Sequence, residues 1–207
     1  MPAGDTTSRP ELQGAPLGLN GLVFKTTDAD ATFAHLQAVG MSDEPPKSFS
    51  RPVEGEQEAR FRTVTCRAAA FGAGRVYFCE HATPELVWRP DQPELLEHAN
   101  GASGIVEMTV VHDEPAAEAA RFGALLEAAP EQQESGWAVG LAGFRITVLS
   151  WPGYRARFGE LALASAGRRT IFGAVGIECG AVTEREVRRI EGFETLVEVY
   201  PPTAPAL

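Results

Sequence analysis

The sequence carries little positive charge. Its 207 residues include 18 Lys and Arg against 28 Asp and Glu, for a formal net charge of −10. Nucleic-acid binding draws much of its affinity from basic side chains that neutralise phosphates, so this charge argues against nucleic acid as a partner. Hydrophobic residues make up 44% of the chain and charged residues 22%, which is typical of a folded globular protein.

Cysteines and long apolar runs are also scarce. The three cysteines, Cys66, Cys79 and Cys179, are widely spaced and form no CxxC pair, so they indicate buried free thiols rather than a zinc or redox motif. No stretch approaches the roughly 20 apolar residues of a membrane span, and the N-terminal segment lacks the apolar core of a signal peptide. We therefore expect a cytoplasmic protein that does not enter a membrane.

The motifs of several enzyme classes are missing. The sequence contains no GxxxxGK[ST], HExxH or GxSxG pattern. Gly72 and Gly74 precede a predicted strand rather than a helix, so they do not form a dinucleotide-binding fingerprint. Nucleotide binding, zinc-protease activity and serine-hydrolase activity therefore have no support.

A strand followed by a capped helix occurs three times. Residues 22–26 predict a strand, and a helix capped by Asp28 or Asp30 follows and ends at Gly40. Residues 105–111 predict a second strand, with Asp113 as the cap and Pro115 in the first turn of the next helix.

The third copy begins with a predicted strand at 174–179. Thr183 and Glu186 form a capping-box pattern, which predicts a helix that ends at Gly192. After this helix the sequence offers one further strand, at 194–200, so the third copy is abbreviated.

Each of the first two helices is followed by a predicted hairpin. The paired segments are 60–69 with 74–80, and 137–141 with 144–149. A repeated β-α-β-β order favours an α+β fold with mixed sheets. We expect a flexible N-terminal arm at 1–17, a first module with its linker at 18–100, and a second module with an abbreviated third βαβ unit at 101–207.

The first copy, with its closing hairpin strand at 76–80, resembles the βαβββ module of the vicinal oxygen chelate superfamily. The segment 78–90, followed by 98–102, is similar to the linking segment of bacterial glyoxalase-like domain proteins. This resemblance covers roughly residues 19 to 199 and implies tandem βαβββ modules that form a cupped mixed sheet with helices on the outside. Glyoxalases, bleomycin resistance proteins and dioxygenases share this scaffold, so the fold does not decide the chemistry.

The resemblance also implies a divalent metal held by His, Glu or Gln side chains on the first and last strands of the modules. The expected His positions fall on Gly21 and Val106, neither of which can coordinate a metal. Glu80 matches the carboxylate of the last strand of the first module, but residues 144–149 contain no counterpart. A catalytic metal typically needs three protein ligands, so we expect the usual quartet to be lost.

Four ligand-type residues cluster in one stretch of sequence: Glu80, His81, His98 and Glu107. If they converge, His81 or His98 can act as a general base oriented by Glu80 or Glu107, or Glu80 can contribute to an atypical metal site. The alternative is structural, with both carboxylates in solvent and His98 in a loop.

Four further residues are candidates for ligand binding: Arg62, Tyr77, Trp88 and Trp151. Arg62 can clamp a carboxylate or phosphate, or can lie on an outer face in water. Tyr77 and Trp88 can line a pocket, although such a Trp often packs a linker onto a core. Trp151 lies in segment 150–154, which follows a predicted strand and can form a lid.

The sequence therefore favours a small-molecule-binding glyoxalase-like protein without the usual metal quartet. The alternative is an enzyme of the superfamily, a lyase, isomerase or dioxygenase, with an atypical His/Glu metal or acid/base site. We also expect a homodimer, because strand 194–200 is predicted to leave an open sheet edge.

Overall fold

The computed structural model describes residues 17–53, 55 and 57–202. The chain divides into two compact units. Unit 1 is Gly21–Glu97, and unit 2 combines the described residues 17–20 with those from His98 onward. The predicted N-terminal arm, apart from Leu17, lies outside the described residues.

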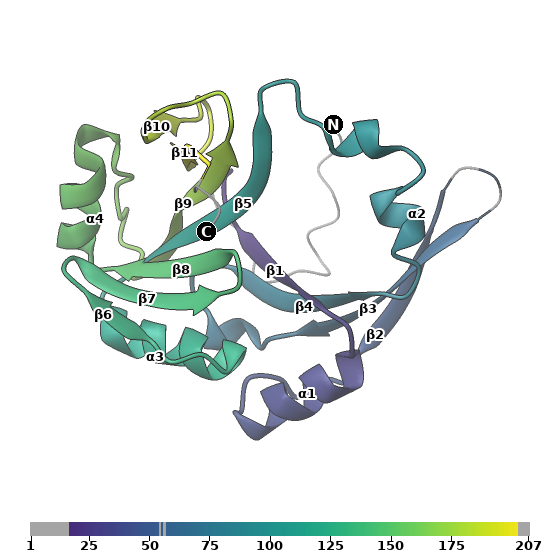
Figure 1. Cartoon of the computed structure of the whole chain (residues 1–207). Helices are drawn as coiled ribbons and strands as arrows, with labels where there is room; N and C mark the ends of the chain where they lie inside the picture. Colours follow the sequence, from purple (N-terminus) through teal and green to yellow (C-terminus); the bar gives the residue numbers. More distant parts are fainter. Residues whose placement is uncertain (1–16, 54, 56, 203–207) are drawn as a thin grey trace. The chain divides into compact units, whose positions relative to one another are not determined.

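Unit 1 is one βαβββ module (Figure 1). Its elements are β1 (Gly21–Thr26), α1 (Ala29–Ala38), β2 (Lys47–Pro52), β3 (Glu58–Thr65) and β4 (Arg75–His81), and the strand order is β1-β4-β3-β2. β1 runs parallel to β4, while the other pairs are antiparallel. A 3₁₀ turn (Ala68–Ala70) precedes β4, and helix α2 (Glu85–Trp88) and a second 3₁₀ turn (Pro93–Leu96) follow it.

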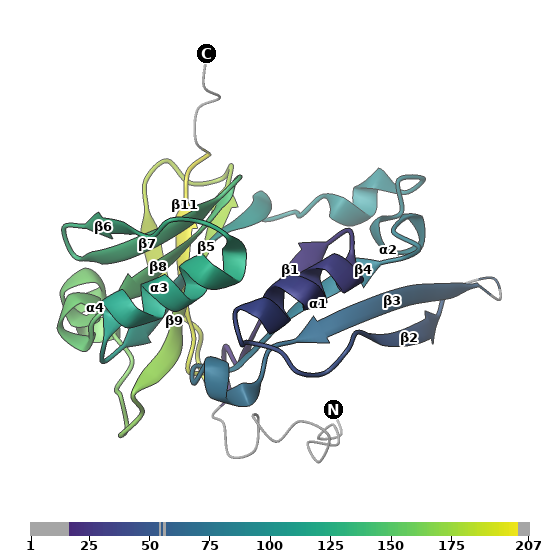
Figure 2. The same cartoon turned by 90° about the horizontal axis from the view of Figure 1, so that it is seen from below.

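Helix α1 begins and ends as the sequence predicts. The Asp28 side chain accepts hydrogen bonds from the backbone N–H groups of Asp30 and Ala31, which makes it the N-cap. Gly40 has φ +71° just beyond the helix, a conformation that favours glycine. The helix packs against β3 and β4 and covers one face of the sheet (Figure 2).

Unit 2 contains a second module with the same topology. It comprises β5 (Ala102–His112), α3 (Pro115–Leu126), β6 (Glu131–Gln133), β7 (Gly136–Leu141) and β8 (Phe144–Leu149). The order β5-β8-β7-β6 repeats that of unit 1. Pro115 opens α3 as predicted, although the cap residue is Glu114 rather than Asp113.

The third module keeps its strands and lacks its helix. β9 (Thr170–Cys179), β10 (Glu186–Arg189) and β11 (Leu196–Tyr200) are ordered β9-β11-β10, and β9 pairs antiparallel with β5. The helix predicted after Thr183 is therefore wrong: only residues 180–185 separate β9 from β10, and Val187 packs onto the core of unit 2. The predicted open edge at 194–200 is also wrong, because β11 lies between β9 and β10.

The predicted α+β fold class is confirmed, with βαβββ modules in mixed sheets of four and seven strands. Several elements were not predicted, among them α2 and β6. β2 lies within the connection expected at 41–59, and the segment expected to form a lid begins helix α4 (Trp151–Phe158). None of the helices in the described part of the chain is long and apolar enough to cross a membrane.

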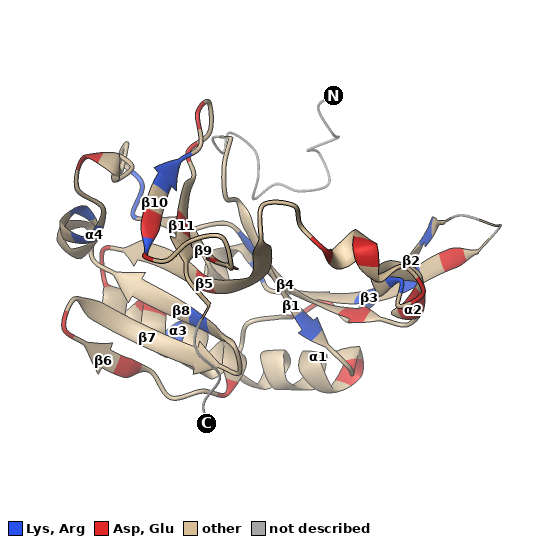
Figure 3. Ribbon diagram, turned by 45° about the horizontal axis from the view of Figure 1, so that its top comes forward, with Lys and Arg blue, Asp and Glu red and all other residues tan. Residues whose placement is uncertain are grey.

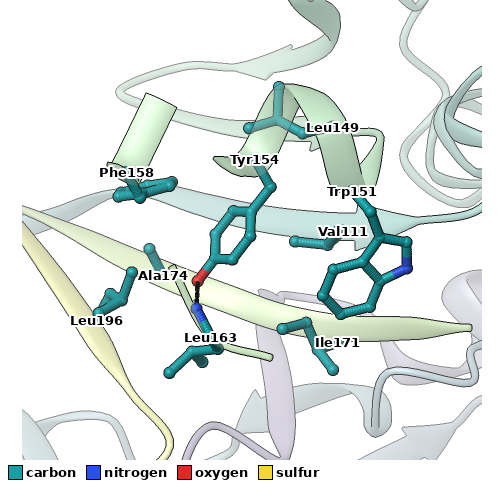
Figure 4. Close-up of a cluster of buried hydrophobic side chains, with 9 residues drawn as sticks. All are labelled: Val111, Leu149, Trp151, Tyr154, Phe158, Leu163, Ile171, Ala174 and Leu196. Atoms are coloured by element: carbon teal, nitrogen blue, oxygen red, sulfur yellow. Dashed lines mark hydrogen bonds between the residues drawn. The ribbon is translucent and has the colours of Figure 1, made fainter. Parts of the chain in front are cut away.

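Helix α4 packs onto the sheet face opposite to that covered by α3. Tyr154 and Phe158 of α4 lie in a core with Leu149, Ala174 and Leu196 (Figure 4). The fully buried Tyr154 hydroxyl donates a hydrogen bond to the carbonyl oxygen of Gly173 (2.9 Å). We call this α4-covered face the inner face of unit 2.

The outer face of the third module stays uncovered because its helix is missing. A pocket of about 340 Å³ opens there. Its lining is largely apolar and includes Ile177, Val197 and Val199. In the second module the corresponding side of the sheet packs against α3, which contacts β5, β7 and β8.

Candidate functional site

The inner face of unit 2 holds a network of carboxylates and arginines. Glu107 lies on β5 opposite Gly176 of β9, and Gly176 lies opposite Glu198 of β11, so the two carboxylates flank one glycine. The network consists of Glu107, Arg145, Arg157, Arg185, Glu198 and Tyr200.

Arg157 of α4 bridges the two carboxylates. Its Nη2 lies 3.0 Å from Glu107 Oε1 and 2.8 Å from Glu198 Oε2. Arg145 Nη2 lies 2.8 Å from Glu107 Oε2, and Arg185 Nε donates to Glu198 Oε1 at 2.8 Å. Both carboxylates have no exposed surface, so burial without these partners would be very costly.

Gly176 has no side chain, which lets Glu107 and the Tyr200 ring approach each other closely across β9. A Cβ at this position would lie 2.7 Å from Glu107 Cβ and 2.9 Å from the Tyr200 ring. Tyr200 uses the space to donate its hydroxyl hydrogen to Glu107 Oε2 at 2.8 Å.

The surroundings of Glu107 keep it ionised. Burial opposes its charge, but hydrogen bonds from Arg145 and Thr147 and the charges of Arg157 and Arg145 lower its pKa to about 2. Burial, and then the nearby Glu107 carboxylate, raise the pKa of the Tyr200 hydroxyl to about 12. At neutral pH the network therefore holds a charged carboxylate and a protonated phenol.

The network does not fit the divalent metal that the family resemblance implies. Glu107 and Glu198 stand on the first strand of one module and the last strand of the other, but guanidinium and phenol groups already occupy their oxygens. Among the residues that the structure describes, no three His, Cys, Asp or Glu side chains gather as a metal-binding group. At Val106 a register shift between Ile105 and Glu107 leaves this residue without a partner on β9.

Unit 1 presents a second face of interest, the side of its sheet opposite α1, which we call the inner face of unit 1. Strand alternation and the register place the following residues on it: Gly21, Val23, Lys25, Lys47, Phe49, Arg51, Ala59, Phe61, Thr63, Thr65, Arg75, Tyr77, Cys79 and His81. Leu86 and Val87 of α2 pack against Phe61 and Cys79 at one end. Several of the other side chains remain exposed, including Val23 and Phe49 at 50% and 43%.

Two predicted site residues meet on this face. His81 stacks on Trp88, with ring centroids 5.7 Å apart and planes 10° apart. His81 also meets Phe61 edge-on at 5.1 Å, and Phe61 stacks on Phe49 at 5.1 Å. The four rings form an aromatic row that crosses β2, β3, β4 and α2.

The surroundings of His81 lower its basicity. Burial, and then the charge of Lys25, lower the pKa of this imidazole, which favours the neutral form. Its Nδ1 is buried without a hydrogen-bond partner. Tyr77 lies on the same face, beneath the guanidinium of Arg75, whose Cζ lies 4.8 Å from the ring centroid.

Glu80 and Arg62 point to the other side of the sheet. Glu80 Oε2 accepts a hydrogen bond from the Ala29 backbone N–H (2.9 Å) at the start of α1. Arg62 makes a bidentate pair with Asp30 at 2.7 and 2.9 Å and lies 3.6 Å from Glu80. Both residues therefore support α1, and Glu80 does not orient His81.

The remaining candidates belong to unit 2. His98 is exposed in the segment before β5, and its backbone carbonyl accepts a hydrogen bond from the Gly101 N–H. Trp151 is 8% exposed in the core beneath α4. Glu107 is the only one of the predicted catalytic residues that lies in the carboxylate–arginine network. The sequence did not indicate its partners Arg145, Arg157 and Tyr200, which lie 38 to 93 positions away.

Comparisons with known proteins place this geometry in context. A family model described as a glyoxalase-like domain matches residues 2–126. A hypothetical protein from Staphylococcus aureus superposes with a TM-score of 0.65 at 10% identity, over 88% of this chain and 66% of that one. A mutant of 4-hydroxymandelate synthase from Streptomyces coelicolor superposes with a TM-score of 0.52 at 12% identity, over 96% and 75%. No curated protein matches the chain significantly.

Proposed function

Because the chain belongs to the glyoxalase-like domain family of the vicinal oxygen chelate superfamily, we propose that it binds a small organic molecule without a metal ion. The observation that carries this proposal is the Arg157 guanidinium between the buried carboxylates of Glu107 and Glu198. A divalent cation at this place would have to displace a charged group that is hydrogen-bonded to both. The network supplies the positive charge that these two carboxylates need.

The inner face of unit 1 is the surface that best suits the ligand. Aromatic rings offer large apolar area with defined geometry, and Trp88 at the end of the aromatic row is 46% exposed. Tyr77 adds a phenol on the same face. Thus His81, Trp88 and Tyr77, three residues singled out from the sequence, contribute to one proposed binding surface.

Metal analysis tests the first part of the proposal. Protein purified without an affinity tag is titrated with Mn²⁺, Fe²⁺, Ni²⁺ and Zn²⁺, and its metal content is measured after dialysis. We expect no stoichiometric metal. One equivalent of metal that is lost in Glu107→Gln, Glu80→Ala or His98→Ala would overturn the metal-free proposal.

Intrinsic fluorescence tests the second part. Trp88 is the only tryptophan in unit 1, since Trp137 and Trp151 belong to unit 2. The probe is 4-hydroxymandelate, taken from the name of the similar synthase. We expect saturable quenching that is absent in Trp88→Phe and retained in Trp137→Phe. Quenching that is equal in both variants would exclude the inner face of unit 1 as the binding surface.

A second candidate function, an enzyme acting beside a carbonyl group, is favoured by one observation. His81 has a lowered pKa, and a neutral imidazole can serve as a general base at neutral pH. Its test is exchange of the carbon-bound hydrogens of hydroxyacetone in D₂O, followed by NMR. Exchange that is faster than in buffer, and that is lost in His81→Gln, would support the enzyme. Exchange at the buffer rate would favour a binding protein without this activity.

We also propose that the protein works in the cytoplasm. Cys66, Cys79 and Cys179 are free and buried, as a reducing compartment permits. Burial raises the pKa of Cys66 to about 12 and also raises that of Cys79, so neither thiol is activated. Fractionation of cells that express the full chain, with blotting of each fraction, tests this location.

A further inference from the structure

The inner face of unit 1 concentrates positive charge in a protein of net charge −10. Its strand residues include four cations, Lys25, Lys47, Arg51 and Arg75. None of the strand residues on this face is acidic. Figure 3 shows the basic positions on β1 and β2. A face of one charge sign on a protein of the opposite sign attracts ligands that match the face.

Two of these cations border the aromatic row. Arg51 lies over both Phe49 and Phe61, with its Cζ 5.9 and 5.3 Å from the ring centroids. Its charge also acts on Cys79 of β4, so its influence extends across β3. From the other side, the charge of Lys25 acts on His81. The row from Phe61 to His81 therefore lies between two positive groups.

The position of Arg51 over the two rings leaves its guanidinium group beside the aromatic row. A guanidinium near an aromatic ring can still donate hydrogen bonds, because its N–H groups lie in the plane of the group and point outward from it. Two parallel N–H groups match the two oxygens of a carboxylate. Lys25, in contrast, is an exposed point charge that can approach an anion from any direction.

We propose that the ligand of this face is an aromatic molecule that carries a carboxylate. Its ring packs along the aromatic row, where Phe49 and Trp88 are exposed, and its carboxylate binds Arg51, with Lys25 adding long-range attraction. This inference rests on the proposed function, because it names the ligand class of the same surface.

The other face of the same two strands provides a control. Strand alternation places Ser48, Ser50 and Arg60 on that face, and they line a pocket of about 420 Å³ that residues Phe49 and Phe61 also border. Arg60 and Arg51 lie on neighbouring strands, but the register places their side chains on opposite faces of the sheet. Arg51→Gln and Arg60→Gln therefore each remove one positive charge, but from opposite faces of the sheet.

The experiment is calorimetric titration of the full chain with three compounds that share one ring. These are 4-hydroxyphenylacetate, its neutral amide 4-hydroxyphenylacetamide, and the cation tyramine. We expect the acid to bind at least about ten-fold more tightly than the amide, because charge-assisted hydrogen bonds are roughly twice as strong as neutral ones. The affinity for the acid should fall between 0.05 and 0.5 M NaCl, while that for the amide stays constant.

The variants assign this preference to residues. Arg51→Gln should reduce the acid-to-amide ratio to near one, Lys25→Gln should reduce it partly, and Arg60→Gln should leave it unchanged. Arg51 and Lys25 are exposed, so their replacement should not prevent folding, and a thermal melt of each variant checks this. Loss of the preference in Arg60→Gln instead of Arg51→Gln would overturn the proposal in favour of the opposite face.

The outcomes separate this inference from the proposed function. Equal binding of acid and amide at the inner face would overturn the ligand class and keep small-molecule binding. Tighter binding of tyramine than of the acid would also overturn the ligand class and keep small-molecule binding. Failure of all three compounds to bind at millimolar concentration, together with the absence of Trp88 quenching, would overturn both.

Discussion

Arg157 Nη2 lies 2.8 Å from Glu198 Oε2, which joins the helix after the second module to the last strand of the third. The same guanidinium reaches Glu107 on the first strand of the second module. One side chain thus connects both modules of unit 2 through charge. Replacement of Arg157 should therefore lower the stability of the protein, because two buried carboxylates would lose the cation that they share.

Arg157→Ala should destabilise the protein strongly. Removal of one partner from a buried ion pair leaves uncompensated charge and costs about 3–5 kcal/mol. The free energy of unfolding, measured by urea denaturation, gives the effect. The matched control is Arg169→Ala, since Arg169 is 69% exposed and its pairs with Asp113 and Glu114 lie at the surface. Such pairs contribute about 0–1 kcal/mol, so equal losses in the two variants would contradict a special role for Arg157.

Stability should fall in acid because of Glu107. Its pKa is about 2 in the folded protein against an ordinary value of 4.5, so its contribution is fully present above pH 4.5 and is lost as the pH falls toward 2. A difference of this size corresponds to about 3 kcal/mol. Urea denaturation between pH 6 and pH 2 should show a gap between wild type and Glu107→Gln that closes in acid. A gap that stays constant would show that Glu107 titrates alike in the folded and unfolded states.

Gly176→Ala should be harmful although alanine is small. The new Cβ would meet Glu107 Cβ at 2.7 Å and the Tyr200 ring at 2.9 Å, and overpacking of this kind costs about 1–3 kcal/mol. Gly140→Ala on β7 is the control, because nothing lies within 4 Å of the place that its methyl group would take. Thermal melts of the two variants should differ by several degrees. Identical melting temperatures would mean that the network adapts to the methyl group.

The protein should form a homodimer. The fold offers three modules, and the second and third pair through β5 and β9, whereas β1 pairs only with β4 among the described strands. A strand with one unpaired side can pair with another chain. Sedimentation at tens of micromolar should show a species of twice the chain mass. A monomer throughout this range would reject the prediction.

Local sequence signals predicted the elements whose ends depend on short-range chemistry. The Asp28 cap and Gly40 fixed α1, and glycine turns marked the hairpins. The prediction of a helix after Thr183 was wrong because Thr183 also suits a turn and Glu186 also suits a strand. The pairing of β10 with β11 decides in favour of the strand. Helix α4 was missed although Ser150 caps it and Pro152 lies in its first turn, both of which are readable signals.

The candidate site was less predictable, because its residues meet only through the fold. Strand alternation places Glu80 and His81 on opposite faces of the sheet, although they are adjacent in the sequence. The partners of Glu107 come from β8, α4 and β11, and no local pattern relates them. The stacking of Trp88 on His81 depends on a short helix within a long predicted loop.

The chain enters and leaves unit 1 through unit 2. The described residues before Gly21 belong with unit 2, where the Glu194 N–H donates to the carbonyl oxygen of Leu17 and Gly18 forms a bridge with Glu194. Among the described residues, the segment 17–20 is therefore part of unit 2 although it precedes unit 1 in the chain. A protease that cuts only after Glu97 would not free unit 1, since the peptide bond between Asn20 and Gly21 still tethers it to the segment held at Glu194.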